Sequence, residues 1–129
     1  MDIFELAQEL LDAHPDRAEA EQIIGLKMKE IFPRNEIDLR TFNDYEVAAD
    51  GGPFARFWLR LPKSRGGTSM DLDLRAGPTR AEILKRFGPQ LPDDSRGEKY
   101  LWQKYKAQSL TWVFGKNGNA EHLWIQNGR

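Results

Sequence analysis

The chain has 129 residues, of which 40% are apolar, and carries 19 basic and 20 acidic side chains for a net charge of −1. This composition is typical of a folded globular domain, and it lacks the excess of Lys and Arg that usually accompanies nucleic-acid binding. The absence of cysteine excludes disulfides, thiolate zinc sites and thiol nucleophiles. We therefore expect a single domain over residues 1–129 with no nucleic-acid partner.

The chain also lacks the signals of membrane proteins. No segment approaches the roughly 20 apolar residues of a membrane span. Met1 to Glu5 contains acidic side chains where a secretory signal would have basic ones, and no apolar run follows. These features predict a cytoplasmic protein without membrane insertion, and they leave its oligomeric state open.

The N-terminal region carries two apolar stripes with helical spacing. The first helix is expected to end at His14, because the following proline disfavours helical geometry in the residue before it. Asp16 can cap a second helix, which Pro33 is expected to close. The apolar stripe of this second helix consists of Ala20, Ile23, Ile24, Met28 and Ile31. The pattern predicts a helical hairpin over residues 1–33.

From residue 43 onward, β alternation replaces helical spacing and is interrupted by one short helix. Thr79 and Glu82 form a capping box, and Gly88 supplies a stop signal, so a helix is predicted over residues 79–87. Asn117-Gly118 favours a type I′ hairpin turn. The predicted strands are residues 43–49, 54–61, 69–75, 100–106, 109–114 and 120–126. The expected fold is thus α+β, with a helical hairpin and an antiparallel sheet of about six strands over residues 43–129, the short helix lying between the third and fourth strands.

No catalytic set emerges from the sequence. The chain has two histidines, His14 at a predicted helix end and His122 in the last predicted strand. A C-terminal cap and an outward strand position explain them without chemistry. No nucleophile elbow of the G-x-S-x-G type is present. We expect no catalytic residues and no cofactor.

Asp71 and Asp73 are the one candidate for a metal site, since they share a strand face two residues apart. Carboxylate pairs bind hard cations such as Mg²⁺. However, any strand with a solvent face produces this pattern, and Arg56, Arg60 and Arg75 are available for cross-strand ion pairs. Ion pairing is the simpler expectation, so we predict no metal.

The four tryptophans carry more information. Strand parity places Trp112 with Leu110 and Phe114 in the core, whereas Trp58 falls on the face of Arg56 and Arg60. Aromatic and arginine side chains on a polar sheet face are typical of protein-binding hot spots. The alternative is that the N-terminal helices cover this face. The predicted partner-binding set is Phe54, Arg56, Trp58, Arg60, Asp71 and Asp73, together with Trp102 and Trp124.

The segment from Gly77 onward resembles a known family, the small α+β domain of SmpA/OmlA-type barrel-assembly lipoproteins, which recurs in the beta-lactamase inhibitor protein. The resemblance rests on the helix motif and on the aromatic strand Leu110–Phe114 with the Asn117-Gly118 turn after it. In the helix motif the matching residues are Gly77, Thr79, Ile83, Leu84, Phe87 and Gly88. This chain differs in having Pro89 directly after Gly88 and no lipid-bearing cysteine. The resemblance implies a sheet that holds partner proteins.

The sequence therefore favours a non-enzymatic protein-binding module. Its most concrete form is a bacterial immunity or inhibitor protein that neutralises a cognate toxin or effector by direct binding. One alternative is an envelope assembly factor of the lipoprotein type. Another is a metal-dependent enzyme that uses Asp71 and Asp73.

Overall fold

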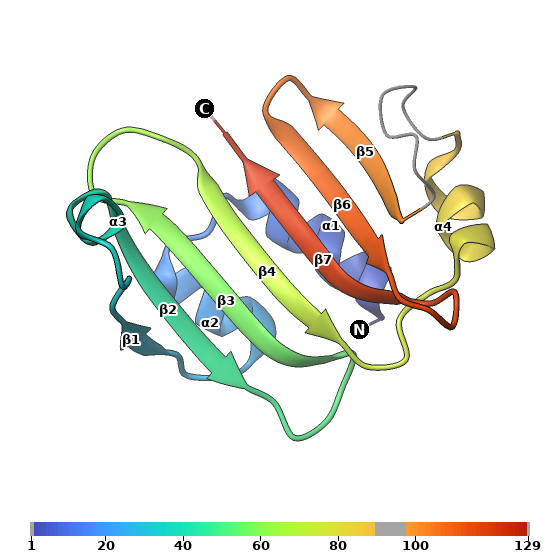
Figure 1. Ribbon diagram of the computed structural model, residues 1–129, viewed down its shortest axis with the longest axis horizontal. Coiled ribbons are helices and arrows are strands. Elements are labelled where there is room, and N and C mark those ends of the chain that lie inside the picture. The colour runs from blue at the N-terminus through green and yellow to red at the C-terminus, as the bar shows by residue number, and fades with distance from the viewer. Residues whose placement is uncertain (1, 90–97, 129) are drawn as a thin grey trace.

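The computed structural model describes residues 2–89 and 98–128, apart from the side chain of Tyr105. In these residues the chain is α+β, with four helices and one seven-stranded sheet (Figure 1). The helices are α1 (Ile3–Ala13), α2 (Arg17–Ile24), α3 (Glu36–Thr41) and α4 (Arg80–Phe87). The strands are β1 (Lys29–Ile31), β2 (Phe42–Ala48), β3 (Phe54–Pro62), β4 (Thr68–Leu74), β5 (Lys99–Tyr105), β6 (Gln108–Phe114) and β7 (Ala120–Asn127).

The sheet consists of two antiparallel meanders that meet in its middle. Its strand order is β1-β2-β3-β4-β7-β6-β5, and each neighbouring pair is antiparallel. Strands β1 to β4 form one meander and β5 to β7 the other, so the pairing of β4 with β7 joins segments that are about fifty residues apart in the sequence. We call this β4–β7 boundary the seam.

One face of the sheet is covered by helices, and the other is open. Figure 1 shows α1 and α2 behind the sheet, with no described helix in front of it. Leu6, Leu10 and Leu11 of α1 pack on the covered face, because helical spacing places them on one side of the helix. The sheet contributes alternating buried residues to this core, including Phe57, Leu59, Met70, Leu72, Leu110, Trp112, Leu123 and Ile125.

Helix α4 forms as its sequence predicts. Thr79 accepts a hydrogen bond from the Glu82 amide at 3.2 Å, and the Glu82 carboxylate accepts one from the Thr79 amide at 3.1 Å, which completes the capping box. The approach to the helix depends on Gly77, where a Cβ would lie 1.9 Å from the Ala120 carbonyl oxygen. A residue without a side chain is therefore required where α4 docks beside the start of β7.

The region between residues 25 and 41 differs from the prediction. Helix α2 ends at Ile24, because Gly25 adopts the left-handed conformation with φ of +74° and its amide bonds the Glu21 carbonyl. The expected helix up to Pro33 is therefore wrong, and the short strand β1 follows instead. The sequence analysis also missed α3, which begins at the Asn35 N-cap.

The connection between β6 and β7 is a hairpin, but it is not the predicted type I′ turn. Of the two central residues, only Gly118 has positive φ, at +86°. Its amide donates to the Gly115 carbonyl at 3.2 Å, and the Gly115 amide donates to the Asn119 carbonyl at 3.0 Å. A longer loop closed by a left-handed glycine therefore replaces the two-residue turn.

None of the helices in the described residues is both long and apolar enough to cross a membrane.

Candidate functional site

The open side of the sheet, which we call the outer face, carries alternating side chains in cross-strand rows. One row runs through Glu46, Trp58, Asp71, Trp124 and Thr111 on β2, β3, β4, β7 and β6. The next row contains Ala48, Arg56, Asp73, His122 and Val113. The register therefore brings Trp58, Arg56, Asp71, Asp73 and Trp124, all predicted from strand parity, onto one surface.

Arg60 connects an aromatic cluster to a buried acid at one edge of the outer face. Its guanidinium lies 4.9 Å from the ring centroid of Trp58 and 4.5 Å from that of Phe42. It also donates two hydrogen bonds to Asp44, at 2.8 and 2.9 Å. Asp44 is only 3% exposed, and its hydrogen bonds raise the pKa of the Arg60 guanidinium. Arg60 thus forms a structural ion pair with Asp44 and lies beside the Trp58 indole.

Arg56 and Arg75 also have partners, but these are not the expected Asp71 and Asp73. Arg56 is the cross-strand neighbour of Asp73, yet its guanidinium bonds Glu46 at 2.8 Å. Arg75 donates to the Ala49 carbonyl. The expected ion pairs from arginine to Asp71 and Asp73 are therefore wrong: in the described part of the chain, no arginine lies within 4.0 Å of either carboxylate.

Asp71, Asp73 and His122 form a compact cluster across the seam. One possible ligand atom from each lies within 4.8 Å of the other two. His122 Nδ1 is 3.0 Å from Asp73 Oδ1, at hydrogen-bond distance. Asp71 Oδ1 is covered and has no hydrogen-bond partner among the described residues. Burial, and then the charge of Asp73, raise the pKa of the Asp71 carboxyl.

The sequence analysis assigned His122 an ordinary outward position and did not include it in the site. Its outward orientation is confirmed, since it shares the outer face with Trp124. Its partner Asp73 lies 49 residues earlier in the chain. Only the register of β4 against β7 pairs the two residues, and no local sequence signal indicates that register.

Trp124 completes the central row beside Asp71. The Lys99 ammonium lies 4.8 Å from the centroid of its indole ring. Trp58 and Trp124 are the cross-strand neighbours of Asp71 on either side. Two indoles thus flank one carboxylate, and each indole has a cation near its ring.

Two predicted members of the binding set lie on the covered side instead. A β-bulge between Phe54 and Arg56 leaves Ala55 without a cross-strand partner, so Phe54 turns into the core, where it is 4% exposed. Trp102 packs against Phe87 of α4, with ring centroids 4.9 Å apart. Their expected places on the outer face are wrong, because the bulge turns Phe54 inward and the register of β5 places Trp102 opposite the buried Leu110.

Helix α3 adds exposed apolar side chains beside the outer face. Asp38 of this helix lies 3.6 Å from Arg60, which places α3 at the edge of the face. Ile37 is 76% exposed, Phe32 73% and Leu39 40%. Phe32, Leu39 and Phe42 are among the residues that line one small hollow of about 120 Å³. Such a concentration of exposed apolar groups is unusual on a surface that meets only water. We call Phe32, Ile37 and Leu39 the α3 border.

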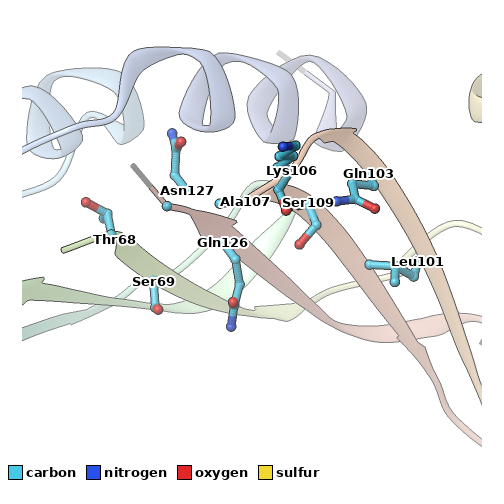
Figure 2. A pocket seen from close by; sticks show the side chains of 11 residues that line it. Thr68, Ser69, Leu101, Gln103, Lys106, Ala107, Ser109, Gln126 and Asn127 are labelled. Carbon is cyan, nitrogen blue, oxygen red and sulfur yellow. Dashed lines mark hydrogen bonds between the residues drawn. The ribbon is translucent and has the colours of Figure 1, made fainter.

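A second hollow, of about 420 Å³, lies at the end of the sheet where β4, β7, β6 and β5 come together (Figure 2). Figure 2 shows Ser69 and Gln126 pointing away from the helix above the sheet, whereas Asn127 points toward it. Asn127 donates to the Leu11 carbonyl of α1. Hydroxyl and amide groups form much of the lining, and Leu101 and Lys106 add an apolar group and a cation.

Comparison with protein-family models, curated proteins and solved structures finds no match to this chain.

Proposed function

We propose that the protein is a binding module that recognises another protein through the outer face and the α3 border. The observation that carries this proposal is an open sheet face with two partly buried indoles beside a row of exposed apolar side chains. Tryptophan and arginine are enriched where protein interfaces concentrate their binding energy. Charge at the rim of such a face promotes fast and selective association.

The charges of the outer face favour a basic partner surface. Arg56 and Arg60 are paired with Glu46 and Asp44, so their charges are largely compensated. Asp71 and Asp73 have no such arginine partner in the described residues, and His122 is their nearest potential cation. A partner that offers Lys or Arg to this position would match the uncompensated charge.

The most concrete form of this function is an immunity or inhibitor protein that neutralises a toxin or effector by covering it. The support for this form is the kind of surface available. The outer face is an open sheet surface bordered by the exposed apolar side chains of the α3 border, which suits contact with another protein surface.

The chain offers a matched pair of leucines for the test. Leu39 on α3 and Leu84 on α4 are both helical and both 40% exposed, but only Leu39 borders the outer face. The tagged protein is used to capture partners from an extract of the source organism and from cells that express its neighbouring genes. Captured proteins are identified by mass spectrometry, and each is then tested against purified variants.

We expect Leu39→Asp and Trp58→Ala to weaken binding of the true partner by at least about tenfold, as loss of an interface anchor does. Leu84→Asp should bind as the wild type does. For an immunity protein, the partner's toxic activity should fall on addition of wild-type protein and recover with Trp58→Ala. Equal binding by all three variants, or loss with Leu84→Asp alone, would contradict the proposed face.

A further inference from the structure

We propose that Asp71, Asp73 and His122 bind a divalent transition-metal ion of the Zn²⁺ type. The sequence indicates only two carboxylates at this position, with arginines expected to neutralise them. The structure adds an imidazole as a third ligand and directs the arginines to Glu46 and Asp44. This inference does not depend on the proposed protein-binding function.

The spacing of the cluster suits a single ion. Ligand atoms at about 2.0–2.2 Å from Zn²⁺ lie about 3–3.5 Å from one another. His122 Nδ1 and Asp73 Oδ1 are already 3.0 Å apart, and all three ligand atoms lie within 4.8 Å of one another. Asp71 therefore has to move by little, and no hydrogen bond among the described residues holds its Oδ1 atom in place.

A second observation distinguishes this cluster from acidic groups that merely share a solvent face. Asp71 Oδ1 is shielded from solvent, yet no described group donates to it. A covered carboxylate oxygen without a donor is costly, so it requires a compensating partner. Asp71 lies between Trp58 and Trp124 in its row, and a cation bound by its carboxylate would offset the cost of burying that group.

The mixed ligand set indicates the class of metal. Carboxylates alone favour Mg²⁺ or Ca²⁺, whereas an imidazole nitrogen favours Zn²⁺ and its neighbours in the first transition row. Three protein ligands leave further coordination positions for water or for a group from another molecule. Asp73 and His122 have side chains that are 38% and 43% exposed, so an ion can reach the cluster from solvent.

The test is isothermal titration calorimetry of the full chain with ZnCl₂, after prior removal of metal with a chelator. The chain has two histidines, and His14 is therefore the natural control for His122. His14 lies in the link between α1 and α2 and contacts Gln108, away from the seam. The variants are His122→Asn, Asp71→Asn and Asp73→Asn, with His14→Asn as the control, and thermal unfolding confirms that each one folds.

We expect one saturable Zn²⁺ site per chain and an increase in melting temperature with Zn²⁺ concentration. Each ligand variant should weaken binding by at least about tenfold, whereas His14→Asn should not change it. The proposal is overturned if no saturable heat appears, if His122→Asn binds as the wild type does, or if His14→Asn removes the binding. MgCl₂ binding with equal affinity would also contradict it, since the imidazole would then contribute nothing.

Discussion

The two faces of the sheet hold their tryptophans in different ways. On the covered face, Trp112 is 0% exposed and packs edge-on against Phe4 of α1, with ring centroids 5.5 Å apart. On the outer face, Trp58 and Trp124 are partly buried and lie beside the cations of Arg60 and Lys99. Packing against helices stabilises the fold, whereas indoles that are only partly buried stay accessible to a ligand.

The largest expected difference between the faces is in stability. Trp112→Ala should lower the free energy of unfolding by about 3–5 kcal/mol, because it removes a fully buried side chain and leaves a cavity. Trp124→Ala should lower it by about 1 kcal/mol or less, because this indole is only partly buried and borders solvent. Urea denaturation followed by circular dichroism measures both values. Similar losses for the two variants would remove the distinction between the faces.

The Asp44–Arg60 pair tests the comparison of the two faces further, because this ion pair lies on the outer face although Asp44 is buried. Asp44→Ala should cost about 2–3 kcal/mol, since Arg60 is then left without its hydrogen-bonding partner in a mostly buried place. Glu46→Ala serves as the control: it removes an ion pair on the same two strands whose side chains are 28% and 41% exposed. That loss should stay below about 1 kcal/mol. Thermal or urea unfolding of the two variants in parallel decides between these expectations.

The smallest expected effect on the free energy of unfolding is an increase, and it comes from substitution of Asp71. Burial raises the pKa of Asp71 in the folded state, so its ionised form destabilises the fold at neutral pH. Asp71→Asn should therefore increase the free energy of unfolding at pH 7, by less than about 1 kcal/mol because the group is partly solvated. The gain should disappear as the pH falls through the raised pKa, where wild-type Asp71 becomes protonated. Urea unfolding as a function of pH, in buffer with a chelator, measures this trend.

Asp50→Asn is the matched control for that measurement, since Asp50 lies exposed in the turn between β2 and β3. It should leave stability unchanged across the same pH range. A loss of stability in Asp71→Asn at neutral pH would show that the ionised carboxylate has a favourable partner, contrary to the geometry of the outer face.

Local signals predicted much of the fold. The capping box at Thr79 placed α4, and alternation placed β2 to β7 to within one or two residues of their observed ends. These features depend on neighbours in sequence, so one chain is enough to find them. The helix expected to reach Pro33 failed because the left-handed Gly25 ends α2 although the apolar spacing continues.

The candidate site was less predictable, because it depends on contacts between distant segments. Phe54 changed faces through a one-residue bulge, which parity arguments cannot detect. Trp102 lies on the covered face because it pairs with Leu110 of β6 and shares a face with the buried Tyr100. His122 entered the site only through the register of β7 against β4.

The seam has a consequence for how the molecule assembles. Asp71 and Asp73 belong to one meander and His122 to the other, so the cluster exists only when both halves have docked. A cation bound there would link the two meanders, and it would bind the native chain in preference to a chain whose meanders are separated. Binding would then stabilise the docked arrangement of the two meanders, and this stabilisation would increase with the concentration of the ion.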